Sequence, residues 1–242
     1  MIQKDSSIFS PVDAYIKALT SRRHTSFYPS SASCYVGKEL IGECLRKLYW
    51  KWKGEPENEG MSYRGWLSCE LGSAFERSFL KGYRQQGLLK ASDVPFRIKI
   101  MGLPISGRLD GLTKKGEVIE CKSVYGKAFY MKLGNSVAHQ PKGEHLCQIM
   151  VYLAALGLDT CLLPYGARDD TGKRQAYRIR KKDIEREGIL FIKIVQRWKI
   201  LQSHIITDII PPRDYDYDHW HCRYCGYRDL CYRKPKELDI TL

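Results

Sequence analysis

Apolar side chains recur at every fourth residue between positions 67 and 83 of the sequence. The series is Leu67, Leu71, Phe75, Phe79 and Tyr83, and this spacing places them on one face of an α-helix. The pattern predicts a long helix that packs against a core along one stripe. Further helices are predicted over residues 11–19, 37–53, 144–157 and 183–204, the last of which ends before two prolines.

Between these helices the pattern changes to that of β-strands. Residues 94–100 alternate between apolar and polar, and residues 105–112 continue the alternation after a turn. Further strands are predicted over residues 117–123, 161–165 and 175–180. The order of elements indicates an α/β or α+β fold in which helices flank a small mixed sheet.

The composition narrows the class of protein. The chain has 242 residues, 43% of them hydrophobic, and a formal charge of +13, so it can bury a core and favours a polyanionic partner such as nucleic acid. The longest uncharged apolar stretch, residues 145–158, is shorter than the roughly 20 residues of a membrane span. Without an apolar leader near the N-terminus, we expect no membrane association and a location in the cytoplasm, in the nucleoid, or in a host's cytoplasm if a phage encodes the chain.

A carboxylate and a lysine lie two residues apart in one predicted strand. Glu120 and Lys122 should face the same way, with Cys121 facing the other, and Asp110 lies on the strand before. Two carboxylates that converge from neighbouring strands suit Mg²⁺ or Mn²⁺, and the lysine could position or deprotonate water or stabilise phosphoryl charge. The alternative is an exposed strand edge with a local Glu–Lys pair.

Residues on two predicted helices could join this group. Glu76 lies on the helix before the strands and could supply a third carboxylate, unless it belongs to a solvated helix face. Gln148 and Tyr152 are four residues apart and share a face of the next helix. These side chains suit contacts to phosphate oxygens or stacking on a base. The alternative is that they belong to a buried helix face on which their polar atoms are hydrogen-bonded.

These motifs together resemble a known family. The segments GSAFE (72–76), GRLDG (107–111), ECK (120–122) and Q-x3-Y (148–152) are similar in order and spacing to the RecB-like branch of the PD-(D/E)XK nucleases. The resemblance implies a restriction-endonuclease-like core. It also implies metal binding by Glu76, Asp110, Glu120 and the Cys121 carbonyl, with Lys122 catalytic beside Asp110 and Glu120. Many RecB-like members carry His where this chain has Glu76.

The C-terminal segment holds a separate cluster of cysteines. Cys222, Cys225 and Cys231 have the spacing C-x2-C-x5-C, which is hard to explain by core packing and indicates a zinc or iron–sulfur site. A fourth ligand must come from elsewhere, with His221 or a distant cysteine such as Cys34, Cys44 or Cys69 as candidates.

The cysteine spacing also resembles one group of these nucleases. An early cysteine that opens a basic, aromatic helix, here Cys44, followed much later by C-x2-C-x5-C, is similar to the iron–sulfur RecB-like nucleases, which include the fourth CRISPR-associated family. The resemblance implies a 4Fe-4S cluster on Cys44, Cys222, Cys225 and Cys231, with Zn²⁺ as the alternative. The cluster would join the C-terminal segment to an N-terminal helix.

The sequence therefore predicts a single nuclease domain over residues 1–242, with an N-terminal helical part (1–66), a catalytic core (67–210) and a cysteine segment (211–242). We expect a metal-dependent DNase that acts on single-stranded DNA or DNA ends, and the resemblance suggests exonucleolytic cutting from the 5′ end. Gln148, Tyr152, Arg108 and Lys142 are the predicted DNA contacts. A helicase or a CRISPR integrase complex is a possible partner, and a non-catalytic DNA-binding scaffold is the alternative function.

Overall fold

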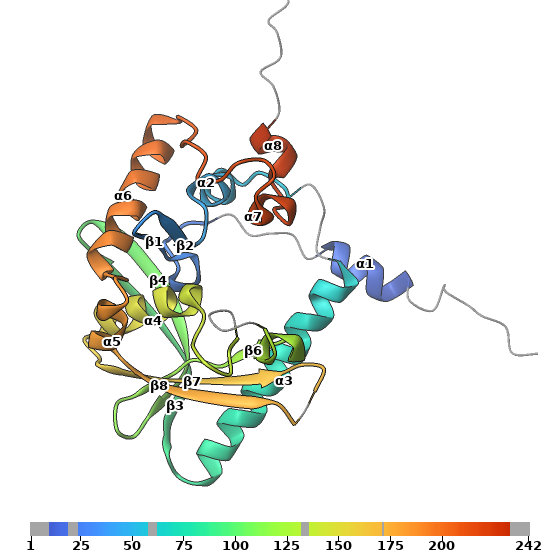
Figure 1. Cartoon of the computed structure of the whole chain (residues 1–242), viewed down its shortest axis with the longest axis vertical. Coiled ribbons are helices and arrows are strands. Elements are labelled where there is room, and N and C mark those ends of the chain that lie inside the picture. The colour runs from blue at the N-terminus through green and yellow to red at the C-terminus, as the bar shows by residue number, and fades with distance from the viewer. Residues whose placement is uncertain (1–9, 19–23, 58–61, 132–135, 171, 233–242) are drawn as a thin grey trace, which may run out of the picture.

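A computed structural model describes residues 10–18, 24–57, 62–131, 136–170 and 172–232 of the chain. Strands from the middle of the chain form one main sheet, and Figure 1 shows how the helices lie around it. The helices are α1 (Ser10–Ala18), α2 (Leu45–Lys53), α3 (Tyr63–Gln85), α4 (Gly143–Leu156), α5 (Lys181–Arg186), α6 (Phe191–Thr207), α7 (Trp220–Arg223) and α8 (Arg228–Tyr232). The strands are β1 (Ser33–Val36), β2 (Glu39–Gly42), β3 (Leu89–Ile100), β4 (Leu103–Thr113), β5 (Val118–Ile119), β6 (Lys122–Val124), β7 (Thr160–Ala167) and β8 (Arg174–Arg180).

The main sheet has six strands and mixed direction, which confirms the predicted fold class. Strands β3, β4 and β5 pair antiparallel in sequence order. β5 and β6 then lie one after the other along β7, both parallel to it, and β8 pairs antiparallel with the other edge of β7. Since β4 pairs with β5 but not with β6, the sheet opens where β5 ends.

The predicted strand over residues 117–123 is therefore two strands. Glu120 and Cys121 lie between β5 and β6 in a non-strand conformation. The amide of Glu120 still donates to the Leu162 carbonyl at 3.0 Å, so the segment stays beside β7 while it leaves β4. The first hairpin is longer than predicted. β3 begins at Leu89, and a tight turn at Met101 and Gly102, both with positive φ, lets β4 begin at Leu103.

Two predicted helices were wrong in extent. Residues 37–42 form the turn and second strand of the small β1–β2 sheet, and α2 begins only at Leu45. Gly42 has a φ of 95°, a conformation that excludes it from a helix and that glycine adopts without strain. The helix predicted over 183–204 is the pair α5 and α6, separated at Gly188, whose φ of 78° ends the first of them.

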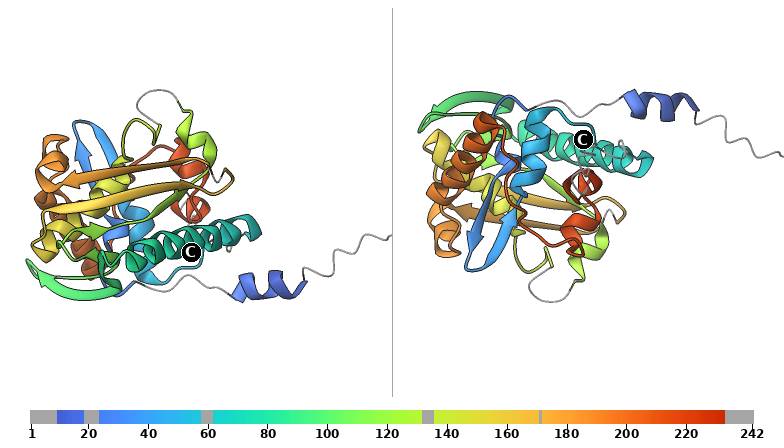
Figure 2. Two further views of the ribbon diagram at one scale, coloured as in Figure 1. Left: turned by 90° about the horizontal axis from the view of Figure 1, so that it is seen from below. Right: turned by 90° about the horizontal axis from the view of Figure 1, so that it is seen from above.

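Helix α3 packs along the sheet, as Figure 2 shows. A side chain on Gly166 of β7 would overlap the ring of Phe75, and one on Gly111 of β4 would meet Leu80, so glycines on the strands allow the helix to approach closely. Helix α4 is almost wholly apolar and contributes Ile149, Met150 and Leu153 to the core. These two helices carry Glu76 and Gln148 to the sheet.

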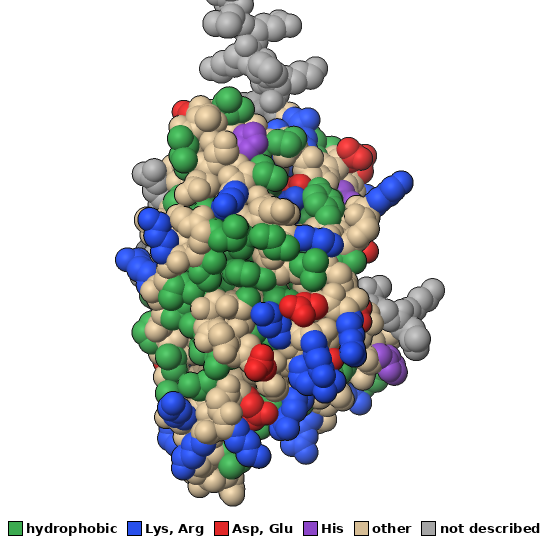
Figure 3. Space-filling model, turned by 90° about the vertical axis from the view of Figure 1, so that its left-hand side faces the viewer, with side chains coloured by type: hydrophobic (Ala, Val, Ile, Leu, Met, Phe, Trp, Pro, Cys, Tyr) green, Lys and Arg blue, Asp and Glu red, His purple; other side chains and the backbone are tan. Residues whose placement is uncertain are grey.

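Basic side chains gather on part of the surface of the protein. Figure 3 shows Lys and Arg side chains gathered on the lower half of one face, below a band of hydrophobic side chains. Exposed basic side chains of β8 and α5 include Arg178, Arg180, Lys182 and Arg186. None of the helices in the described ranges is long and apolar enough to cross a membrane.

Candidate functional site

The carboxylate of Asp110 lies at the point where the sheet opens. Asp110 is on β4, and its Oδ2 accepts a hydrogen bond of 2.7 Å from the backbone amide of Cys121. The Asp110 carboxylate therefore accepts from a backbone amide that is no longer paired with the backbone of β4. This bond holds the β5–β6 break against β4 and brings Asp110 beside Glu120, as the sequence predicts.

Glu120, Lys122 and Gln148 form a closed hydrogen-bonded group. The Oε1 atom of Glu120 accepts from the Lys122 ammonium at 2.6 Å and from the Gln148 amide at 2.8 Å. The same ammonium donates to the Gln148 carbonyl oxygen at 2.9 Å. Glu120 is 3% exposed, and its Oε2 atom is buried with no hydrogen-bond partner among the described residues. A buried carboxylate oxygen without a partner is costly, and a bound cation would satisfy it.

Three carboxylates repel one another at this site. Burial, followed by the charges of Glu120 and Glu76, raises the pKa of Asp110 from 3.8 to about 8. Burial and the nearby carboxylates of Asp93 and Glu120 also raise the pKa of Glu76, against the opposing charge of Arg108. Glu76 from α3 therefore joins the strand carboxylates, and Asp93 is a neighbour that the sequence did not single out.

Lys122 is held as an ammonium ion. Burial alone would lower its pKa, but the Glu120 carboxylate outweighs burial and the pKa is raised. Because Lys122 donates to both Glu120 and Gln148, its position is fixed relative to α4 as well as to β6. The group is arranged to place a positive charge beside the carboxylates rather than to accept a proton.

The Gln148–Tyr152 pair supports the site from within the protein. The Gln148 amide donates to the Tyr152 hydroxyl at 3.0 Å, which donates in turn to the Arg108 carbonyl at 3.1 Å. Tyr152 is 3% exposed and packs edge-on against Phe96. The expectation that Tyr152 stacks on a base was wrong, because neither face of its ring reaches the surface. Its hydroxyl ties α4 to β4.

The two predicted basic contacts lie at the surface around this group. The Arg108 guanidinium is 62% exposed and 3.3 Å from the Asp93 carboxylate. Lys142 caps α4 and its ammonium lies 3.9 Å from Glu144. One turn of helix away, His145 accepts from or donates to the Tyr165 hydroxyl at 2.6 Å, and burial with the charges of Lys122 and Lys142 lowers its pKa well below the usual range.

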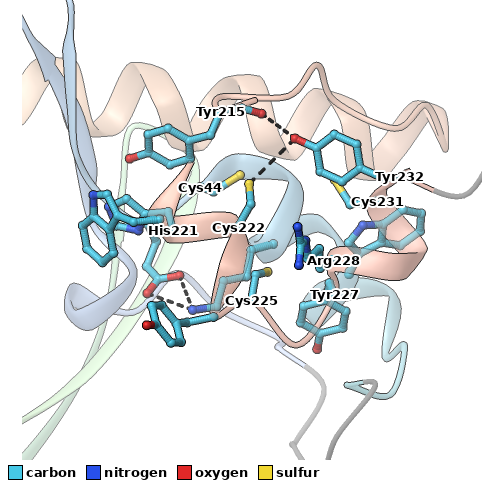
Figure 4. Close-up of a pocket in the computed structure, with 14 residues that line it drawn as sticks. Cys44, Tyr215, His221, Cys222, Cys225, Tyr227, Arg228, Cys231 and Tyr232 are labelled. Carbon is cyan, nitrogen blue, oxygen red and sulfur yellow. Dashed lines mark hydrogen bonds and ion pairs between the residues drawn. The ribbon is translucent and has the colours of Figure 1, made fainter. Parts of the chain in front are cut away.

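The four cysteines singled out from the sequence line one cavity of about 220 Å³. Figure 4 shows Cys44 at the start of α2 and Cys222, Cys225 and Cys231 from the C-terminal segment around it, with His221 at its edge. Burial raises the pKa of Cys44 to about 11. The N-terminal helix and the C-terminal segment thus meet at these thiols.

Hydrogen bonds close the cavity. The Cys222 thiol lies 3.8 Å from the Tyr232 hydroxyl, and the Arg46 guanidinium donates to the Cys231 carbonyl at 3.2 Å and lies 3.7 Å from its sulfur. The donor set suits a soft metal centre in its chemistry. In the described ranges, no three His, Cys, Asp or Glu side chains are close enough together to hold a metal ion as they stand.

Comparison with known proteins identifies the family. The model of the PD-(D/E)XK nuclease superfamily matches residues 29–232, most of the chain, so this protein belongs to the PD-(D/E)XK nuclease superfamily. The mixed sheet flanked by helices agrees with the restriction-endonuclease-like core expected for that superfamily. None of the curated proteins matches the sequence.

Solved structures with the same fold are distant in sequence. The chain is similar to a structure described as SSO0001, with a TM-score of 0.51, 16% identity, and 96% and 98% of the two chains covered. It is also similar to the alkaline exonuclease LHK-Exo from Laribacter hongkongensis, with a TM-score of 0.47, 15% identity, and 81% and 95% coverage. At 16% identity, the similarity to SSO0001 speaks for the fold alone.

Proposed function

We propose that this protein is a metal-dependent deoxyribonuclease whose active site is formed by Glu76, Asp110, Glu120 and Lys122. Membership of a nuclease superfamily supports a nuclease. The observation that carries the assignment is the buried Oε2 of Glu120, which has no hydrogen-bond partner in the described residues although mutually repelling carboxylates surround it. That arrangement is unfavourable in the isolated protein and favourable around a cation.

In this proposal Glu76, Asp110, Glu120 and the carbonyl of Cys121 hold Mg²⁺ or Mn²⁺. The ion would supply an activated water and neutralise charge on the scissile phosphate. Lys122 would place its ammonium beside the phosphate and stabilise the charge that develops there. Gln148 would be a positioning residue, since it holds Lys122 and Glu120 in register.

We further propose that Cys44, Cys222, Cys225 and Cys231 bind a 4Fe-4S cluster, with Zn²⁺ as the alternative. Support comes from the spacing in the sequence and from the cavity that the four thiols share. The centre would join the chain before α2 to its C-terminal segment. Because that link closes a loop of roughly 190 residues, it would stabilise the protein chiefly by restraining the unfolded chain.

The substrate in this proposal is single-stranded DNA or a DNA end, cut as an exonuclease from the 5′ end. The basic charge of the chain supports a nucleic acid, and the polarity rests on the resemblance to RecB-like nucleases. Arg108 and Lys142 are proposed as surface contacts to the DNA backbone. A cytoplasmic location, a single domain over residues 1–242 and a partnership with a helicase or CRISPR integrase belong to the same proposal.

The proposal is tested with single-stranded DNA labelled at the 5′ or the 3′ end and incubated with anaerobically purified protein and Mn²⁺. We expect degradation by the wild type, with the 5′ label released first, and none by Asp110→Ala. If both proteins bind the DNA but neither cuts it, the protein is a non-catalytic DNA-binding scaffold and the proposal fails.

A further inference from the structure

Two arginines flank a tyrosine just beyond the end of β6. The guanidinium carbon of Arg168 lies 4.6 Å from the ring centre of Tyr125, and that of Arg64 lies 5.3 Å from it. The Tyr125 hydroxyl accepts from Arg64 Nε at 3.3 Å and shares a hydrogen bond of 2.9 Å with the Ser68 hydroxyl. Helix α3 and the segments that follow β6 and β7 thus bring two cations and two hydroxyls together.

These cations are not neutralised by the protein. Among the described residues, neither arginine is within 4.0 Å of a carboxylate oxygen. The nearest acidic residue in sequence, Asp169, accepts from the amide of Gly126. The Nε of Arg168 is buried and has no hydrogen-bond partner in the described chain. Such a group is costly without an acceptor, and a phosphate supplies several acceptors.

The cluster is aligned with the proposed active site. Ser68, Gly72 and Glu76 lie four residues apart on α3 and so share one face. Ser68 contacts Tyr125, Gly72 lies against Ser123, and Glu76 reaches the carboxylates. Ser68 therefore lies about two helical turns from Glu76, roughly 12 Å along the helix axis, and Arg64 lies one turn further, at roughly 18 Å. A few nucleotides of a single strand can bridge this span.

We infer that Arg64, Arg168, Ser68 and Tyr125 form a phosphate-binding subsite that holds the DNA strand at a phosphate a few nucleotides from the one that is cut. The inference rests on the proposed nuclease function. A guanidinium pair with an unused N–H suits the geometry of phosphate oxygens, and the two hydroxyls add neutral donors. The phosphate is either a terminal monoester or an internal diester of the strand, which share this chemistry.

The test measures DNA binding by fluorescence anisotropy in EDTA, so that cleavage plays no part. The probes are 5′-phosphorylated, 3′-phosphorylated and circular single-stranded DNA. The variants are Arg64→Gln, and Arg64→Gln with Arg168→Gln. The control is Arg84→Gln, which removes an exposed arginine from the other end of α3, where its guanidinium donates to the Ser92 hydroxyl. The single variant keeps the test valid if the half-buried Arg168 cannot be replaced without unfolding.

We expect the double variant to bind about tenfold more weakly than the control, because charge-assisted contacts are lost. The slope of log K against log salt should fall by about 0.7 for each phosphate contact removed. A loss seen with all three probes assigns an internal diester, and a loss confined to one phosphorylated end assigns a terminal monoester. Either result supports the subsite.

Affinities of both variants within twofold of the control for every probe would overturn the inference, as would a wild type that binds none of them. The binding test separates a failure of the subsite from a failure of the proposed function. A wild type that binds through these arginines but never cleaves would refute the nuclease and leave the subsite. A wild type that cleaves while the variants bind normally would refute only the subsite.

Discussion

The Asp110 carboxylate accepts a hydrogen bond from the amide of Cys121 at the point where β5 leaves β4. A side chain thereby replaces a backbone partner, and the segment that carries Glu120 and Lys122 leaves β4. At this break the Oε2 of Glu120 is without a partner in the described residues. The feature that disrupts regular pairing is therefore the one that assembles the proposed metal site.

Replacing Asp110 with Asn should stabilise the metal-free protein while it abolishes cleavage. The pKa of Asp110 is raised to about 8 in the folded protein, so the folded state holds a proton that the unfolded state has lost above about pH 4. Stability of the wild type should then fall as the pH rises from about 4 to 8. The asparagine side chain cannot ionise and still accepts from the Cys121 amide, so this dependence should disappear.

Denaturant unfolding in EDTA at several pH values checks this prediction. We expect the stability advantage of Asp110→Asn over the wild type to be about 4 kcal/mol larger at pH 8 than at pH 5, since it grows by about 1.4 kcal/mol for each pH unit between the unfolded and folded pKa values of Asp110. Added Mg²⁺ should stabilise the wild type and not the variant. If the wild type and Asp110→Asn have the same free energy of unfolding at pH 5 and also at pH 8, the carboxylates do not repel one another as described.

Lys122→Gln should reduce the rate of cleavage by about 10²- to 10³-fold, the usual effect of removing one group that stabilises transition-state charge. The binding of DNA should change little, because Lys122 is held inside the site by Glu120 and Gln148. Lys114→Gln is the control and should retain the wild-type rate, because Lys114 is exposed in the turn between β4 and β5. Single-turnover kinetics separate the two effects, and a variant that cuts normally would remove Lys122 from the mechanism.

Gly166→Ala should weaken the packing of α3 on the sheet. A methyl group at this position would overlap the ring of Phe75, so the helix that carries Glu76 must move or the ring must turn. We expect a loss of about 1–3 kcal/mol in the free energy of unfolding. Gly82→Ala is the matched control, since it adds the same methyl to α3 where nothing lies within 4 Å, and it should be neutral or stabilising. Equal stability of the two variants would show that the helix does not depend on this close approach.

Cys44→Ser should lower both the metal content and the stability of the protein, if the four thiols share one centre. The residue is far from the tail in sequence but lines the same cavity as Cys222, Cys225 and Cys231. Iron and zinc analysis of anaerobically purified protein provides the readout. Cys69→Ser is the control, because Cys69 lies on the exposed side of α3 and outside the cavity. Unchanged iron and zinc in Cys44→Ser would exclude this cysteine as a ligand.

The sequence predicts those parts of the molecule that local pattern determines. The helix predicted from the i+4 series and the alternation in the β3–β4 hairpin were confirmed. The series is not a buried stripe along its whole length, because Leu67 and Leu71 are exposed. The small β1–β2 sheet was missed because its second strand runs almost directly into the basic, aromatic helix α2, and the sequence pattern does not reveal that Gly37 and Gly42 adopt positive φ. The break at Glu120 was missed because its cause is a tertiary contact from Asp110.

The site itself was only partly predictable. The residues Asp110, Glu120 and Lys122 follow from their order and spacing, and the structure brings them together with Gln148. The role of Tyr152 was misjudged, since spacing cannot tell an inward hydroxyl from an exposed ring. The group of Arg64, Tyr125 and Arg168 has no signal in the sequence, because these residues are far apart in the chain and meet only after β6 and β7 have paired.

The most direct test of the central claim is the initial rate of single-stranded DNA cleavage as Mg²⁺ or Mn²⁺ is titrated into metal-free protein. Asp110→Asn is measured in parallel, since it keeps the fold and removes one proposed ligand. We predict no cleavage without metal, saturable activation of the wild type, and no activation of Asp110→Asn at any concentration. Cleavage of equal rate in EDTA, or an Asp110→Asn curve that matches the wild type, would contradict the account.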